Sequence, residues 1–235
     1  MHFSKLLSNT PIKFPDQRCL LCGDTSSSGL CLCNPCLEEL PFIEHACQKC
    51  GLPTVEDTPL CGYCLIETPH NHRAVSILHY KAPVDYLIKK LKYHNQLEVA
   101  DLLGSLLVAK LKHLDWPLPE QIIPVPLHIN RLQQRGYNQA VEIARTVSKS
   151  LNVPVNLTNC IRTRVTVPQI ELSFEDRKNN LENAFEVVHQ IPAKHVAIID
   201  DVMTTGSTLN ALTDALLQSG IQKVDIWACS RATLN

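Results

Sequence analysis

The chain has no long apolar run and almost no net charge, and both absences exclude classes of protein. No stretch approaches the roughly 18 uninterrupted apolar residues that a membrane-spanning helix needs. The first residues lack an apolar run followed by a small-residue cleavage site, so we expect no signal peptide. A formal net charge of -1 argues against a chain that coats nucleic acid by overall charge, although it does not exclude a local basic patch. Because 45% of the residues are hydrophobic, disorder is excluded too, and we expect a folded cytoplasmic protein.

Cysteine is abundant, and its positions divide the sequence. Nine of the eleven cysteines lie within the first 64 residues. Eight of these nine form four CxxC pairs, and ten residues separate the two pairs of each half. The module CxxCG…LCxxC therefore occurs twice at an offset of 28 residues, which is an internal repeat. The paired residues are Cys19, Cys22, Cys33, Cys36, Cys47, Cys50, Cys61 and Cys64.

Two CxxC turns supply four thiolates, which is the tetrahedral ligand set of structural zinc. A disulfide framework would need an oxidising compartment, which the expected absence of a signal peptide contradicts. A redox role would need a thioredoxin-like strand and helix context around the pairs, which the sequence lacks. We therefore predict a double zinc ribbon over residues 1–70 that holds two zinc ions and gives shape or recruits a partner.

Spacing leaves the ligand assignment of these ions open in two respects. It does not decide whether each ion takes sequential or crossed pairs of cysteines. Three histidines, His45, His70 and His72, are alternative ligands, although we expect them to be ordinary surface residues. Cys31 is expected to be spare, and Cys160 and Cys229, in apolar surroundings, to be inert core residues.

Residues 71–235 alternate between strand and helix patterns. Apolar alternation or continuous apolar runs predict strands, and apolar residues at helical spacing predict helices. Such alternation indicates an α/β domain with a mostly parallel sheet. The expected strands are 74–80, 121–126, 194–202 and the end of 219–232, and the expected helices are 83–93, 98–114, 138–151 and the segment that follows Thr208.

The most informative segment lies at the end of the expected strand 194–202. Asp200 and Asp201 emerge at the strand tip, and a hydroxyl-rich turn from Thr204 to Thr208 leads into a helix. Backbone N–H groups, hydroxyls and the helix N-terminus of such a turn suit a phosphate, and Gly206 allows close approach. The paired acids suit ribose hydroxyls or Mg²⁺. The alternative is that the acids are surface caps before an ordinary turn.

The sequence IIDDVMTTGST at 198–208 resembles the signature of type I phosphoribosyltransferases, which bind 5-phosphoribosyl-1-pyrophosphate (PRPP). The resemblance implies a parallel sheet with helices on both faces. It implies that the two aspartates contact the ribose hydroxyls, with Mg²⁺ bound alongside PRPP, and that the turn holds the 5′-phosphate. The expected PRPP-binding residues are Asp200, Asp201, Val202, Met203, Thr204, Thr205, Gly206, Ser207 and Thr208.

Further motifs, together with the cysteine module, make the whole chain similar to the ComF family of competence-associated proteins. They are Pro124-Val-Pro126, the run from Arg131 through Arg135 to Gln139, and a set comprising Arg162, Thr166, Gln169, Arg177, Asn180, Ala184 and Phe185. This resemblance implies a role in natural transformation, in which the protein handles single-stranded DNA entering the cytoplasm. It also implies a ComF-type DNA helicase and recombination mediators as partners.

Three segments with basic residues have both a functional and an ordinary interpretation. Arg131 and Arg135 could bind pyrophosphate bidentately, as catalytic residues beside the two aspartates, or form a solvated basic turn. The polar segment 162–177 is either a hood over the active site or a passive loop. On the helix at 83–94, Lys89, Lys90 and Lys92 either follow a nucleic-acid backbone or form a solvated face.

Two functions from different classes follow. In the first, the protein is an active phosphoribosyltransferase, and an unknown nitrogen acceptor displaces pyrophosphate from PRPP. In the second, which we favour, the fold is a PRPP-sensing or DNA-handling module, and the zinc ribbon is its docking surface. We favour the second function because the ribbon and the lysines of the helix at 83–94 both then have a use, whereas a pure transferase has little use for a zinc ribbon. The sequence has no recognisable nucleobase pocket, so the acceptor of the first function is unknown.

Overall fold

A computed structural model of the chain describes residues 17–26, 28–163 and 184–233. Its central sheet contains four parallel strands in the order β3-β8-β7-β4, with bounds Arg73–His79, Lys223–Arg231, His195–Met203 and Gln121–Pro124. The predicted parallel α/β sheet and the preceding cysteine-rich region are confirmed. Most of the expected strands begin or end one or a few residues away from these bounds.

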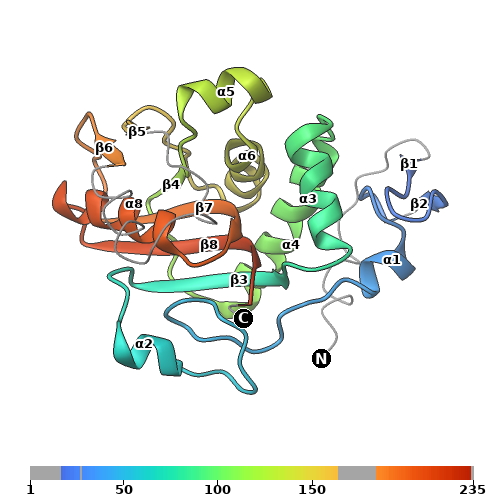
Figure 1. The fold of residues 1–235 in the computed structure, drawn as a ribbon, viewed down its shortest axis with the longest axis horizontal. Helices are drawn as coiled ribbons and strands as arrows, with labels where there is room; N and C mark the ends of the chain where they lie inside the picture. Colours follow the sequence, from blue (N-terminus) through green and yellow to red (C-terminus); the bar gives the residue numbers. More distant parts are fainter. Residues whose placement is uncertain (1–16, 27, 164–183, 234–235) are drawn as a thin grey trace, which may run out of the picture.

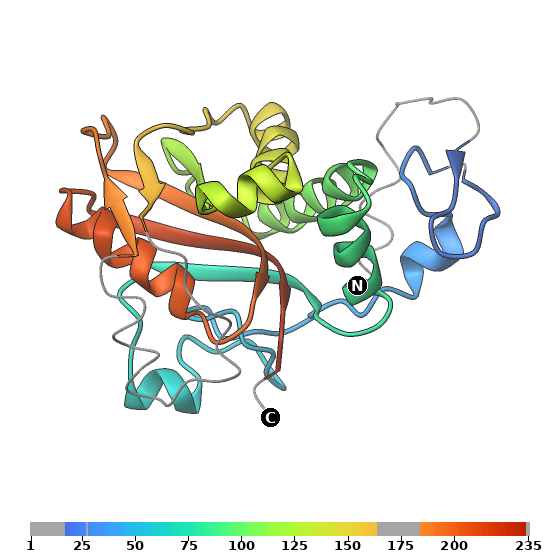
Figure 2. The ribbon, with the colours of Figure 1, turned by 45° about the horizontal axis from the view of Figure 1, so that its top comes forward.

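Helices cover both faces of the sheet, as the resemblance implied (Figure 1). The helices α3 (Val84–Tyr93), α4 (Glu98–Leu114) and α6 (Gln139–Leu151) pack on one face, and α8 (Ser207–Gln218) packs on the other (Figure 2). Within β7, Ala197 and Ile199 join the first core, and Val196 and Ile198 join the second. This alternation explains why the strand reads as a continuous apolar run: both of its faces are buried.

Seven short elements complete the described part of the chain. The helix α5 (Ile129–Arg135) follows β4, and the antiparallel pair β5 (Cys160–Arg162) and β6 (Phe185–Val187) lies beside α8. None of these three elements was expected from the sequence. In the cysteine-rich region the elements are β1 (Gln17–Arg18), β2 (Thr25–Ser26), α1 (Asn34–Glu38) and α2 (Gly62–Ile66). No helix within the described ranges is long and apolar enough to cross a membrane.

The cysteine-rich region packs directly on the α/β part. Its connecting segment runs antiparallel to the free edge of β3, where Phe42 pairs with Leu78 and the Ile43 N–H donates to the Ile77 carbonyl at 2.9 Å. The first cysteine half adds apolar side chains to the core under α3 and α4. The second half, which includes α2, lies below β3 in Figure 1. The two halves of the repeat therefore contact different parts of the fold.

Candidate functional site

The carboxyl edge of the parallel sheet brings together side chains from three separate segments. Asp200 and Asp201 lie near the end of β7, α5 follows the end of β4, and the last turn of α3 reaches the same edge. Ligands of open α/β sheets bind outside this edge, since the loops that follow the strands meet there. These residues form the candidate site.

Asp201 is buried, and a lysine and a glutamine hold its carboxylate. The side chain of Lys92 lies 2.5 Å from Oδ2, and Gln139 Nε2 donates to Oδ1 at 3.1 Å. Only 2% of Asp201 is exposed. The expectation that both aspartates lie exposed at the strand tip is therefore wrong for Asp201, because α3 and α6 cover it, whereas Asp200 is only partly buried.

The two acids differ in their affinity for a proton. Burial and the adjacent carboxylate of Asp201 raise the pKa of Asp200 well above its usual range. Burial also acts to raise the pKa of Asp201, but the Lys92 ammonium and the Gln139 amide outweigh it and hold that pKa below its usual value. Asp200 therefore holds a proton more tightly than Asp201 does.

Gln139 owes its place to the start of α6. Asn138 caps this helix by accepting a hydrogen bond from the Ala140 N–H at 2.9 Å, and its amide donates to the Val125 carbonyl just after β4. This cap fixes the first helical residue, Gln139, over Asp201. Gln139 Oε1 also accepts a hydrogen bond from Arg135, so one amide joins the guanidinium of α5 to the acid of β7.

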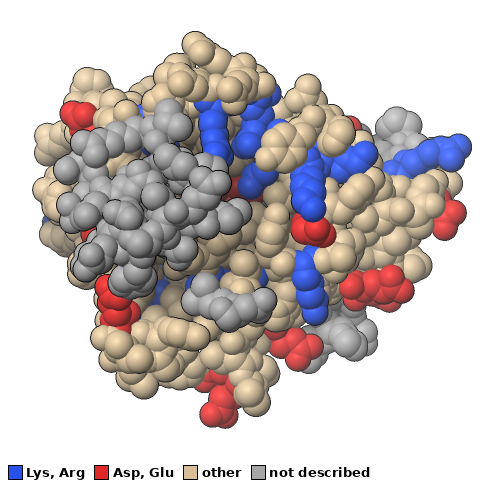
Figure 3. All heavy atoms as spheres, viewed as in Figure 1, with Lys and Arg blue, Asp and Glu red and all other residues tan. Residues whose placement is uncertain are grey.

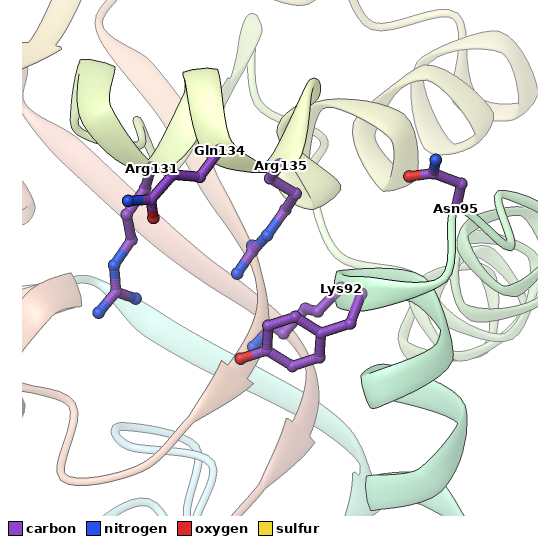
Figure 4. Close-up of a pocket in the computed structure, with 6 residues that line it drawn as sticks. Lys92, Asn95, Arg131, Gln134 and Arg135 are labelled. Atoms are coloured by element: carbon purple, nitrogen blue, oxygen red, sulfur yellow. The ribbon is translucent and has the colours of Figure 1, made fainter.

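A cavity of about 520 Å³ opens beside this network. It is lined by Lys92, Tyr93, Asn95, Arg131, Gln134 and Arg135. Figure 4 shows the two arginines extending from α5 towards the strands, with Lys92 directed into the same region from α3. Basic side chains gather where α5 faces α3 (Figure 3), so this cavity attracts anions.

The three lysines of α3 do not form one basic face. Lys92 pairs with buried Asp201, Lys89 pairs with Asp85 at 3.0 Å, and Lys90 lies over the ring of Tyr86. Helical geometry turns Lys92 towards the sheet edge, and the contact of the three lysines with nucleic acid stays a prediction. The sequence could not reveal this pairing, since Lys92 and Asp201 lie 109 positions apart.

The hydroxyl-rich turn follows β7 directly. Gly206 has a left-handed φ of 86°, and Ser207 begins α8, with the Thr205 and Ser207 hydroxyls 2.7 Å apart. Thr204 and Thr205 are exposed, whereas the side chain of Met203 is buried in the core under α8. Of the expected PRPP-binding residues, Met203 can therefore offer a ligand only its backbone.

The structure leaves the proposed hood untested. The residues Thr166, Gln169, Arg177 and Asn180 lie outside the described residues. Arg162 ends β5, with its guanidinium 5.4 Å from the ring centre of Phe185.

The eight paired cysteines form two compact tetrads, each built from sequential pairs. One contains Cys19, Cys22, Cys33 and Cys36, and the other contains Cys47, Cys50, Cys61 and Cys64, with the sulfurs of each within 4.8 Å of one another. Cysteine spacing alone left both sequential and crossed pairing open, and the structure shows sequential pairing.

Both tetrads fit zinc. A tetrahedral ion with bonds of about 2.3 Å needs sulfurs about 3.8 Å apart. The sulfur separations are 3.6 Å for Cys22 and Cys33, 3.9 Å for Cys47 and Cys64, and 3.6 Å for Cys50 and Cys61. The two cysteine tetrads therefore form two zinc-ribbon sites with four thiol ligands each, which leaves no ligand position for a histidine.

The histidines considered as alternative ligands have other partners. His45 lies 3.4 Å from Asp57, and His70 lies 2.6 Å from Asp214. His72 and His195 both lie 3.0 Å from the buried carboxylate of Asp225 at the amino edge of the sheet. Cys31, expected to be spare, directs its thiol to the Glu98 carbonyl, and burial raises its pKa to about 12.

Comparison with known proteins places these features in a family. Residues 12–65 match the double zinc ribbon domain. Similar solved structures include adenine phosphoribosyltransferase from Leishmania tarentolae (12% identity, TM-score 0.38, 66% of this chain and 91% of that one). Another is hypoxanthine phosphoribosyl transferase from Trypanosoma cruzi (15% identity, TM-score 0.35, 58% of this chain and 72% of that one).

Relatives in sequence are much closer than these structures. Competence protein F of Haemophilus influenzae is 40% identical over 173 residues, which are 70% of this chain and 75% of the relative. DNA utilization protein YhgH of Escherichia coli K12 is 35% identical over 167 residues, 69% of this chain and 74% of the relative. Competence protein ComFC of Bacillus subtilis is 29% identical over 102 residues, 42% of this chain and 39% of the relative. The chain belongs to the ComF family of competence-associated proteins.

Proposed function

We propose that this protein acts in the use of DNA taken up by the cell, and that its carboxyl-edge site binds PRPP together with Mg²⁺. The observation that carries the proposal is the arrangement at this edge. Lys92, and Arg135 through Gln139, join Asp201 of β7 to the cavity that the arginines of α5 line, and the hydroxyl-rich turn follows the same strand. The names of the relatives, competence protein and DNA utilization protein, support the biological role.

Each part of PRPP has complementary groups at this edge. The turn from Thr204 to Thr208 offers hydroxyls and the N-terminal N–H groups of α8 to the 5′-phosphate. Asp200, the partly buried acid, suits the ribose hydroxyls, while Lys92 and Gln139 cover Asp201 beside it. Arg131 and Arg135 suit the pyrophosphate, which planar guanidinium groups bind bidentately. Carboxylate oxygens are ligands that Mg²⁺ accepts, and a bound Mg²⁺ would neutralise charge on the pyrophosphate.

Single-stranded DNA is the second ligand that we propose, with the cavity rather than the whole of α3 as its contact. Tyr93 is 70% exposed, and the Arg135 guanidinium lies 5.6 Å from its ring centre. An exposed aromatic ring beside cationic side chains is the combination that binds bases by stacking and phosphates by charge. We propose the zinc ribbon as the docking surface for a ComF-type helicase and for recombination mediators.

The alternative function is that of an active phosphoribosyltransferase. Two arginines and Mg²⁺ beside a leaving pyrophosphate would stabilise its developing charge. Incubation with Mg²⁺, PRPP and a panel of nitrogenous bases, with pyrophosphate release as readout, tests this alternative. Release with one base supports the transferase, and no release with any base supports a binding module.

Calorimetric titration with Mg²⁺ and PRPP tests the binding proposal. The variant Gly206→Val places a branched residue at φ 86° inside the turn, and Gly220→Val does the same at φ 103° outside it, between α8 and β8. We expect binding heat from the wild type and from Gly220→Val, and at least about a tenfold loss of affinity in Gly206→Val. Absence of heat from the wild type would refute the proposal, as would equal affinities of the two variants.

A further inference from the structure

Arg231, the last residue of β8, is a buried cation that the proposed site does not use directly. Only 3% of the residue is exposed, and its guanidinium donates to backbone carbonyls of three separate segments. One guanidinium that joins several backbone segments fixes their relative positions, because its donors form a rigid planar fork. These segments include the second zinc tetrad and the start of the hydroxyl-rich turn.

On the zinc side, Arg231 Nε donates to the carbonyl of Cys50 at 3.3 Å. Cys50 belongs to the second tetrad and to its first tight turn, which the Gly51 N–H closes by donating to the Cys47 carbonyl at 2.8 Å. This turn packs against β3. A Cβ added to Gly51 would lie 2.7 Å from the Ser76 hydroxyl, and the Ala74 N–H donates to the Gln48 carbonyl.

When zinc is bound, electrostatic attraction between the thiolates and the guanidinium strengthens the contact of Arg231 with the Cys50 turn. Four thiolates around one Zn²⁺ carry two net negative charges, and a buried cation next to them offsets part of that charge. Loss of zinc would remove this charge and the constraint on the Cys50 carbonyl together.

On the ligand side, Arg231 Nη1 donates to the carbonyls of Met203, at 3.3 Å, and of Thr204. Thr204 is the first residue of the turn that we propose for the 5′-phosphate. A second hydrogen bond, from the Ala232 N–H to the Met203 carbonyl at 2.9 Å, joins the same two segments. The backbone at the entry of the turn is therefore held by the residue that also holds the zinc turn.

We infer that Arg231 is a positioning residue that makes the conformation of the phosphate-binding turn depend on the second zinc site. The inference rests on the proposed function in so far as the turn binds PRPP. The second zinc ion thereby acts on ligand binding from outside the cavity, through the chain of contacts from Cys50 to Arg231 and Thr204.

The internal repeat supplies a matched control for this inference. Cys22 occupies in the first tetrad the position that Cys50 occupies in the second, 28 residues later. The first tetrad packs with α3 and α4, and Figures 1 and 2 both show its segment beyond α3. Replacing Cys50 by serine removes a zinc ligand but keeps the backbone carbonyl that Arg231 binds. The variants Cys22→Ser and Cys50→Ser should each lose one of two zinc ions.

Hydrogen exchange of residues 203–208, metal analysis and calorimetry with Mg²⁺ and PRPP are the measurements. We expect at least about tenfold faster exchange in Cys50→Ser than in Cys22→Ser, and PRPP affinity lowered by a similar factor. Equal exchange in the two variants would overturn the inference. A wild type that shows no PRPP heat, with exchange that still responds to Cys50→Ser, would refute the proposed function and leave the coupling intact.

The variant Arg231→Lys tests the residue itself and keeps its charge. A lysine cannot span several carbonyls, so we expect faster exchange at 203–208 while the protein still binds two zinc ions. Unchanged exchange with two bound zinc ions would show that Arg231 does not position the turn. By reciprocity, Mg²⁺ with PRPP should raise the affinity of the wild type for one zinc ion in equilibrium competition with a chelator, and an unchanged zinc affinity in a protein that binds PRPP would contradict the inference.

Discussion

The side chain of Lys92 lies 2.5 Å from the Oδ2 atom of Asp201, and both groups are largely withdrawn from water. The two residues come from α3 and β7, which pack together only in the folded chain. The pair has two consequences. It keeps the second acid of the site ionised, and it places a cation at the edge of the cavity beside the arginines of α5.

The first prediction concerns the stability that this pair provides. In Lys92→Met the Asp201 carboxylate is left buried without its cation, so we expect the free energy of unfolding to fall by about 3 kcal/mol. In Lys89→Met, a control on the same helix, an exposed pair with Asp85 is lost, and we expect a much smaller effect. Urea denaturation of both variants measures the difference.

A second substitution identifies the cause of the loss. Asp201→Asn removes the charge that Lys92 neutralises, so Lys92→Met combined with Asp201→Asn should be less destabilised than the sum of the single variants. Additive effects would show that Lys92 contributes by packing alone, and that the pair does not determine the charge of Asp201.

The second prediction concerns the pH dependence of stability. The pKa of Asp200 is raised in the folded state by burial and by Asp201, so the folded state binds its proton more tightly than the unfolded state. Asp200 therefore costs no stability below the usual aspartate pKa, and it lowers stability as pH rises from there through the folded pKa. We expect Asp200→Asn to be more stable than the wild type at neutral pH.

The contribution of Asp201 to stability depends on pH in the opposite direction. Its pKa is lowered in the folded state, so its contribution to stability is present above the usual aspartate pKa and is lost as pH falls through the folded pKa. Denaturation of the wild type, Asp200→Asn and Asp201→Asn between about pH 3 and pH 8 separates the two contributions. Destabilisation by Asp200→Asn at neutral pH would contradict the assignment of the proton to Asp200.

The sequence predicted those parts of the structure that rest on local patterns. The repeat of CxxC pairs identified the two zinc sites, and continuous apolar runs located the strands that are buried on both faces. The sequence could not predict the pairing of Lys92 with Asp201 or the contacts of Arg231, because these depend on how distant segments pack. Arg231 reads only as the polar end of an apolar strand, and its contact with Cys50 spans 181 positions.

The third prediction concerns the surface that contacts single-stranded DNA. If the cavity binds DNA, Arg131→Gln combined with Arg135→Gln removes two phosphate contacts. We then expect the slope of log K against log salt to become shallower by about 1.4, which is about 0.7 per contact for a single strand. Fluorescence anisotropy of a labelled oligonucleotide across a salt series measures this slope.

The matched control for this prediction lies on α3. Lys89→Gln combined with Lys90→Gln removes the same number of charges, but these lysines are already engaged by Asp85 and by the Tyr86 ring. We expect this variant to change the slope less than the arginine variant does. An equal or larger change in the slope would indicate that DNA contacts the exposed part of α3 instead of the cavity. An unchanged slope in both variants would exclude both surfaces. Competition by Mg²⁺ and PRPP for the oligonucleotide would further show that the two ligands share the cavity, because their phosphates would need the same arginines.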